Sequence, residues 1–154
     1  MSELKSSAEQ VNQTQQLIAE LQGERSAVWQ LYCQIAEMKP LFNTDNIRPV
    51  LSSFSQLLID YISLGHFGVY RHVLADPQCE PSAIDFAERI YPQFANTTAS
   101  AISFNDQYDN GKRNFKTDNL ASDLSVLGEN LVKRMELEDR LCSMLVGQPN
   151  QQPA

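Results

Sequence analysis

Apolar residues recur every three or four positions along most of the chain, and this spacing predicts long amphipathic helices. Four such segments are separated by short polar or proline-containing stretches. No segment alternates apolar and polar residues convincingly with the period of two that a half-buried strand requires. We therefore predict an all-α fold, an antiparallel bundle of four long helical segments.

Two apolar stripes define the first half of the predicted bundle. The first helix ends before Lys39-Pro40, because proline disfavours helical geometry at the preceding residue. Its stripe consists of Leu17, Leu21, Glu24, Val28, Leu31, Ile35 and Met38, in which Glu24 is the one polar member. The second helix is expected from about Ile47 to Leu74, and its stripe consists of Ile47, Leu51, Phe54, Leu58, Tyr61 and Val69.

The second half of the bundle follows the same rule. A third helical segment opens at Pro81-Ser82, and Pro92 is expected to break it into two consecutive helices. The last helix carries a stripe of Leu120, Leu124, Leu127, Leu131, Met135, Cys142 and Leu145. We assign residues 1–8 to a flexible N-terminus, residues 9–147 to a single helical-bundle domain and residues 148–154 to a disordered tail.

The second helix departs from the usual pattern, because residues 57–70 are apolar nearly all round. At 100° per residue, Asp60 points away from the core stripe together with Leu57, Leu64 and Phe67. Two interpretations are open. Either the fold covers this helix on both sides, or the helix presents an apolar patch with a carboxylate in its middle to a protein partner.

Several polar residues fall where the pattern predicts the bundle interior. Glu138 lies within the apolar stripe of the last helix, where an unpaired carboxylate is costly. We expect Arg25, next to the similarly placed Glu24, or His66 to pair with it in a structural polar network. Gly65 costs about 0.5 to 1 kcal/mol relative to alanine inside a helix, which indicates a close approach by another backbone or by a side chain of a partner.

Composition narrows the classes of function. The chain has 19 acidic and 12 basic residues, a formal charge of -7 and a pI of about 4.7, so its surface repels nucleic acid and anionic membranes. A basic partner suits this charge, although acidity also serves solubility alone. The cluster Lys112, Arg113 and Lys116 is too small for a nucleic-acid site. With no signal peptide and no membrane-length apolar run, we expect a cytoplasmic protein.

The sequence offers little support for catalysis or a cofactor. A di-iron bundle site needs Glu-x-x-His motifs, and neither His66 nor His72 follows a glutamate at that spacing. The sequence also lacks the hydrolase, phosphate-loop and zinc-protease motifs, so we expect no enzyme activity, no metal and no cofactor. Cys33, Cys79 and Cys142 are odd in number and widely spaced, which indicates reduced, mostly buried thiols.

Residues 57–70 are the most distinctive stretch of the sequence and read Leu-Leu-Ile-Asp-Tyr-Ile-Ser-Leu-Gly-His-Phe-Gly-Val-Tyr. This stretch is similar to the Leu-Val-Asp-Tyr-Leu-Ser-x-Gly-His-Phe motif of the Rsd/AlgQ family, the bacterial regulators of sigma D that act as anti-sigma factors. Further matches are Tyr32 with Lys39-Pro40, Ile90-Tyr91-Pro92-Gln93 where the family has Ile-Trp-Pro-Gln, and Leu137-Glu138-Asp139-Arg140-Leu141 where it has Leu-Glu-Asp-Lys-Leu. The first helix departs from the family pattern at Ala19-Glu20-Leu21.

The resemblance implies a helical, monomeric protein that binds the primary sigma factor 1:1, chiefly its C-terminal helix-turn-helix domain, and contacts no nucleic acid itself. Holding that domain would deny it both promoter DNA and its seat on core RNA polymerase. The implied grip consists of Leu57, Asp60, Leu64, Phe67 and Arg71, with Asp60 offering its carboxylate to an arginine or lysine of sigma. The residues agree in kind, because an acidic surface with an apolar patch suits a basic DNA-reading domain.

A function of another class also fits the sequence. An adaptor that binds and regulates a metabolic or signalling protein would use the same acidic, partly apolar surface. Sequence alone does not separate it from an anti-sigma factor, because such a surface does not name its partner.

Overall fold

The computed structural model of the chain describes residues 2–38, 44–75, 79–108 and 117–146. Within these segments it leaves out the side chains of residues 2–11, 44, 66, 67, 69 and 146. The predicted tail 148–154 and the basic cluster between residues 112 and 116 lie outside the described residues.

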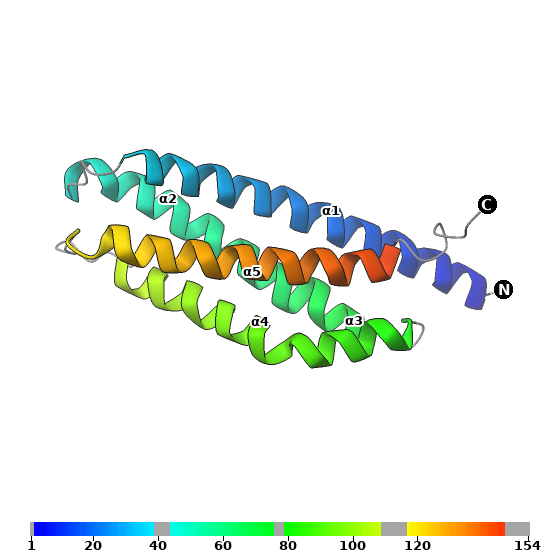
Figure 1. The fold of residues 1–154 in the computed structure, drawn as a ribbon. Coiled ribbons are helices and arrows are strands. Elements are labelled where there is room, and N and C mark those ends of the chain that lie inside the picture. Colours follow the sequence, from blue (N-terminus) through cyan, green and yellow to red (C-terminus); the bar gives the residue numbers. More distant parts are fainter. Residues whose placement is uncertain (1, 39–43, 76–78, 109–116, 147–154) are drawn as a thin grey trace, which may run out of the picture.

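The described chain is helical and folds into an antiparallel bundle (Figure 1). Its elements are α1 (Ser2–Glu37), α2 (Thr44–Ser63), a π-helical turn η1 (Leu64–Tyr70), α3 (Arg71–Ala75), α4 (Pro81–Tyr108) and α5 (Leu120–Val146). Because α2, η1 and α3 follow one another without a break, they form one long segment. The prediction of an all-α bundle of four long helical segments is confirmed.

The four segments close into a ring, in which α1 packs against α2, α2 against α4, α4 against α5, and α5 against α1. The apolar stripes face the centre of this ring. They build a main core around residues such as Val28, Phe54, Leu58 and Leu124. A second, smaller cluster lies around Tyr70, where α3, the first half of α4 and the end of α5 meet.

The predicted end of α1 agrees with the structure, whereas the helix begins earlier than expected. The helix ends at Glu37, directly ahead of Lys39-Pro40 as predicted. It begins at Ser2, inside the stretch 1–8 assigned to a flexible N-terminus, and in Figure 1 its first turns run past the ends of the other helices. The domain boundary at residue 9 stays a prediction.

Pro92 does not divide the third segment. It lies inside a single helix, α4, so the expectation of two consecutive helices is wrong. Proline removes one backbone hydrogen bond and crowds the carbonyl four residues earlier, which kinks a helix rather than ending it where packing is strong. Ile90 and Phe94 are both buried on either side of Pro92, and Figure 1 shows the axis of α4 changing direction along its length.

A glycine brings α1 and α5 close together. The hydroxyl of Tyr32 on α1 donates to the carbonyl oxygen of Leu124 on α5 at 2.9 Å. A side chain at Gly128 would overlap that hydroxyl, so only glycine leaves room for the tyrosine. Trp29 stacks on Tyr32 with 4.9 Å between ring centroids. The contact fixes the register of the two helices.

The three cysteines lie in different environments. Cys33 is exposed, Cys79 is half-buried and Cys142 is buried, so the expectation of mostly buried thiols is wrong for Cys33. Burial, with the nearby negative charges of Glu138 and Asp139, raises the pKa of the Cys142 thiol to about 12. That thiol therefore stays protonated near neutral pH.

Candidate functional site

The residues predicted to bind a partner lie along one helical segment but in different surroundings. Asp60 is exposed near the end of α2, and Arg71 is exposed at the start of α3. Leu57 and Leu64 are half-buried and pack against the main core. The side chain of Phe67 lies outside the described residues.

The structure bears on both interpretations of the apolar second helix. Because α2 packs against α1 on one side and α4 on the other, the fold itself covers much of the apolar surface. Leu57 and Leu64 keep part of their surface in solvent. Among the described side chains of the predicted grip, Leu57 and Leu64 are therefore the ones that offer apolar surface to a partner.

A second carboxylate lies close to Asp60. Burial raises the pKa of Glu24 on α1, and the negative charges of Asp60 and Glu20 raise it further. The Oε2 atom of Glu24 is buried and accepts no hydrogen bond from the described residues. Asp60 itself accepts a long hydrogen bond, 3.3 Å, from Gln56. Glu24 and Asp60 therefore form an acidic pair in which each member is close enough to act on the charge of the other.

The inner carboxylate, Glu138, is fully engaged. It is 3% exposed, and the hydroxyl of Tyr61 donates to its Oε1 atom at 2.5 Å. The Nε atom of Arg134 donates to its Oε2 atom at 3.2 Å. Arg25 lies 3.9 Å from Oε1 and reaches outward to Asp139 at 2.6 Å. Each oxygen of Glu138 therefore accepts at least one hydrogen bond.

Arg134 is the centre of this network and has no exposed surface. Its Nη1 atom donates to the hydroxyls of Thr97 at 3.0 Å and Thr98 at 2.8 Å, and its Nη2 atom donates to the carbonyl oxygen of Ile62 at 3.3 Å. The guanidinium also lies over the ring of Phe94, 3.9 Å from its centroid. Its charge is therefore neutralised and hydrogen-bonded although it is buried.

Burial and pairing act in opposite directions on this pair. Burial raises the pKa of Glu138 and lowers the pKa of Arg134, because each loses hydration of its charged form. Their mutual attraction opposes both changes. Burial and the charge of Glu138 also raise the pKa of Tyr61, so its hydroxyl stays a donor. In this network Tyr61 and Arg134 therefore stay hydrogen-bond donors and Glu138 stays the acceptor.

The network differs from the predicted one. The structure brings Arg25 close to Glu138, as one of the two predicted pairings requires. Glu24 instead faces Asp60, and the side chain of His66 lies outside the described residues. Sequence reasoning missed Arg134, although a signal was present. Arg134 stands four residues before Glu138, the spacing of a helical ion pair.

Gly65 is unfavourable inside a helix, which predicted a close neighbour at this position, and the structure has one. A Cβ atom there would lie 3.0 Å from Nη2 of Arg134, 3.1 Å from Oε2 of Glu138 and 3.6 Å from Leu21. The neighbour is thus the buried ion pair on α5, not another backbone or a partner. The surrounding π-helical turn, Leu64–Tyr70, was not predicted, and the step of 100° per residue applies only as far as Ser63.

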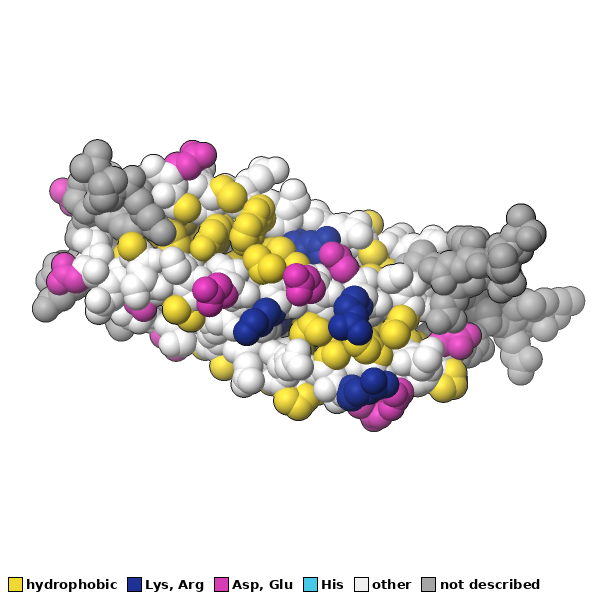
Figure 2. Space-filling view, viewed as in Figure 1, with side chains coloured by type: hydrophobic (Ala, Val, Ile, Leu, Met, Phe, Trp, Pro, Cys, Tyr) yellow, Lys and Arg dark blue, Asp and Glu magenta, His cyan; other side chains and the backbone are white. Residues whose placement is uncertain are grey.

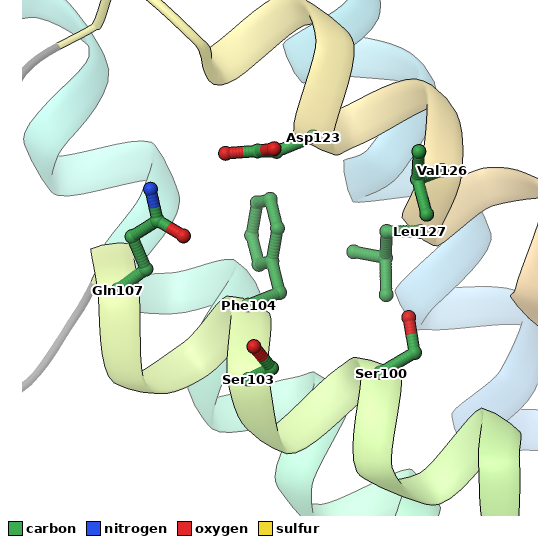
Figure 3. Close-up of a pocket in the computed structure, with 7 residues that line it drawn as sticks. All are labelled: Ser100, Ser103, Phe104, Gln107, Asp123, Val126 and Leu127. Atoms are coloured by element: carbon green, nitrogen blue, oxygen red, sulfur yellow. The ribbon is translucent and has the colours of Figure 1, made fainter.

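A hollow of about 150 Å³ between α4 and α5 is a weaker candidate site (Figure 3). Ser100, Ser103, Phe104 and Gln107 line it from α4, and Asp123, Val126 and Leu127 line it from α5. Its carboxylate is already engaged, because the Tyr108 hydroxyl donates to Asp123 at 2.5 Å. Among the described residues, no group of three or more His, Cys, Asp or Glu side chains could hold a metal ion.

The face formed by α1, α5 and α4 carries mixed chemistry (Figure 2). Hydrophobic side chains gather on it in two groups, with acidic and basic side chains between them. In the same view α2 passes behind α5. No helix in the described part of the chain is long and apolar enough to cross a membrane.

The helical bundle, with the exposed carboxylate of Asp60 on its second helix, can now be compared with known proteins. The family model described as the regulator of RNA polymerase sigma(70) subunit, Rsd/AlgQ, matches residues 1–146. The chain belongs to this family, and the resemblance found in the sequence is confirmed.

Individual relatives carry one name. The protein called regulator of sigma D of Yersinia enterocolitica is 28% identical over 145 residues, covering 92% of this chain and 87% of its own. Its namesake from Yersinia pestis is also 28% identical, covering 92% and 86%. That of Enterobacter sp. (strain 638) is 34% identical over 98 residues, covering 61% and 57%. No solved structure matches the chain.

Proposed function

We propose that the protein is an anti-sigma factor, which binds and sequesters the primary sigma factor and lowers its use by RNA polymerase. The main contact is the C-terminal helix-turn-helix domain of sigma. Membership of the sigma(70) regulator family supports this proposal, as does the name of the relatives, regulator of sigma D. The protein acts in the cytoplasm by 1:1 binding as a monomer, without catalytic turnover and without touching DNA.

The acidic pair carries the proposal. In the free protein, Glu24 has a buried oxygen without a hydrogen-bond donor among the described residues, and its neighbour is a second carboxylate. An arginine or lysine of a DNA-reading domain would donate to the exposed carboxylate of Asp60 and offset the negative charge of both acids. Leu57 and Leu64 add apolar contact beside it. The formal charge of -7 favours approach of a basic domain.

Calorimetric titration with the purified C-terminal domain of sigma tests this function. Wild-type protein binds at 1:1, and binding weakens as salt is added, because exposed charge pairs are screened. The matched variants are Asp60→Ala in the acidic pair and Asp106→Ala, an exposed acid on α4. The first weakens binding by about 1 to 2 kcal/mol, whereas the second leaves it unchanged.

Two outcomes would overturn the proposal or part of it. A wild-type protein that ignores sigma removes the anti-sigma function, and capture of a metabolic or signalling protein from the native cytoplasm would favour the adaptor instead. Equal binding by Asp60→Ala and wild type would mean that sigma binds elsewhere on the bundle.

A further inference from the structure

The π-helical turn divides the proposed partner surface in two. Leu57 and Asp60 precede it on α2, and Arg71 follows it on α3. A π-helical turn bonds each residue to the fifth one along, so it is wider than an α-helical turn. Residues after it are rotated relative to the direction an uninterrupted α-helix would give them. The position of Arg71 relative to Asp60 therefore depends on this turn.

Such turns need support from the surrounding structure, because their hydrogen bonding is less favourable and they are rare. Here Nη2 of Arg134 donates to the carbonyl oxygen of Ile62. In an α-helix this carbonyl accepts the amide of residue 66, which lies inside the turn. The guanidinium thus bonds to the backbone of the helix next to the point where its register changes.

The glycine at position 65 and the ion pair fit together. Because a Cβ atom would come within 3.0 Å of Arg134 and 3.1 Å of Glu138, the missing side chain is what allows the pair to lie against the turn. The pair in turn fills the space that the turn leaves inside the bundle. A Cβ atom at position 65 would therefore require the pair to move by a few tenths of an ångström.

The same pair is tied to the other three helical segments. Thr97 and Thr98 hold Arg134 from α4, and Tyr61 holds Glu138 from α2. Arg25 on α1 approaches Glu138, and Arg25 directly follows Glu24 in the chain. A displacement of Arg134 and Glu138 would therefore change contacts both at the π-helical turn and on α1.

We propose that Arg134 and Glu138 are positioning residues for partner binding: the buried pair holds the turn Leu64–Tyr70 in its π-helical form and thereby sets the surface that sigma meets. The role in binding rests on the proposed function. The role in shaping the turn does not, because the hydrogen bond to Ile62 and the fit at Gly65 are features of the free protein.

The test replaces the network by an apolar core of similar volume in the full chain, with the triple variant Tyr61→Phe, Arg134→Met and Glu138→Leu. A buried ion pair exchanged as a unit leaves no unpaired charge, so this variant folds with a melting temperature at or above that of wild type. Hydrogen exchange followed by mass spectrometry then reports the turn. We expect faster exchange confined to residues 62–70 and sigma affinity reduced about tenfold or more.

A pair of glycine variants tests the same idea with a single added methyl group. Gly65→Ala pushes against Arg134 and Glu138, whereas Gly23→Ala on α1 meets nothing within 4 Å. We expect Gly65→Ala to change exchange in residues 62–70 and to weaken sigma binding, and Gly23→Ala to change neither. This comparison holds even if the triple variant does not fold.

The outcomes separate the two proposals. Wild-type exchange across residues 62–70 in a folded triple variant, or in Gly65→Ala, overturns the positioning role. Altered exchange with unchanged sigma affinity confines the pair to a structural role and also overturns it. If wild type itself does not bind sigma, the proposed function fails, while the exchange data still decide whether the pair shapes the turn.

Discussion

Two carboxylate sites differ in their surroundings: Glu138 on α5, and the acidic pair of Glu24 on α1 and Asp60 on α2. Glu138 is 3% exposed, yet Tyr61 and Arg134 donate to its two oxygens. Glu24 keeps more contact with solvent, yet one of its oxygens has no donor among the described residues and its neighbour is Asp60. The buried acid is satisfied and the more exposed acid is not.

The contrast separates structure from function. A satisfied buried carboxylate specifies packing, because its partners are all supplied by the chain. An unsatisfied pair of acids lowers the stability of the free protein, and a cation from outside relieves it. Functional surfaces often carry such a cost, since affinity for a partner and stability of the free protein make different demands. The acidic pair therefore supports the proposed partner surface more strongly than exposure alone does.

The largest expected effect is in the inner network. Arg134→Met leaves Glu138 buried without its main cation, and we expect a loss of about 3 to 5 kcal/mol in the free energy of unfolding. Urea denaturation measures it. Adding Glu138→Leu to the same chain should restore most of the loss. A single variant as stable as wild type would mean that the pair contributes nothing to the fold.

The next effect is on binding rather than on stability. Asp60→Ala should reduce sigma affinity by about 1 to 2 kcal/mol. Its free energy of unfolding should stay within about 0.5 kcal/mol of wild type, because Asp60 is exposed and makes one long hydrogen bond. Calorimetry and urea denaturation on one preparation give both values. If Asp60→Ala loses stability but keeps its affinity for sigma, Asp60 has a structural role and not a role in partner binding.

Glu24→Gln should act in opposite directions on stability and binding. Burial and neighbouring charge raise the pKa of Glu24 above 4.5, so the folded chain holds this proton more tightly than the unfolded chain does. Ionised Glu24 therefore costs stability at pH 7 and costs nothing once pH falls well below 4.5. We expect the variant to be more stable at pH 7, with a gain that disappears in acid, and to bind sigma more weakly.

Urea denaturation of both proteins between acid and neutral pH checks that sign. A variant whose gain persists in acid would show that the carboxylate charge is not the cause. If the Glu24→Gln variant binds sigma as tightly as wild type, Glu24 does not contribute to sigma binding.

The smallest expected effect is in the chemical labelling of the cysteines, which leaves the fold unchanged. Burial and the charge of Glu138 raise the pKa of Cys142 to about 12, so iodoacetamide should modify Cys33 and spare Cys142 in the folded protein. Mass spectrometry of peptides measures both. In Arg134→Met, labelling of Cys142 should rise as the inner region opens more often. Rapid labelling of Cys142 in wild type would contradict a closed interior.

The sequence predicted the fold class because apolar spacing fixes which side of each helix is buried. The stripes through Val28, Phe54 and Leu124 all face the core. The break predicted at Pro92 is wrong, because the burial of Ile90 and Phe94 on both sides outweighs the local preference of proline against helix. Tertiary packing, which the local pattern does not contain, decided that region.

The site was predictable in part for a related reason. Asp60 and Glu138 each interrupt an apolar pattern, and that signal is visible in one dimension. Which residues meet them depends on helices far apart in the chain, so Tyr61 and Arg134 were not identified as partners of Glu138. The π-helical turn escaped prediction because its sequence satisfies α-helical spacing as well.

The stacked ring pair on α1 gives the protein an intrinsic fluorescent reporter of the contact between α1 and α5. Trp29 is the single tryptophan of the chain, and it lies on Tyr32, whose hydroxyl is bonded to α5. All tryptophan emission therefore comes from a ring that stacks on the tyrosine bonded to α5. Separation of α1 from α5 changes the colour and intensity of that emission, so opening of the bundle can be followed optically without any added dye.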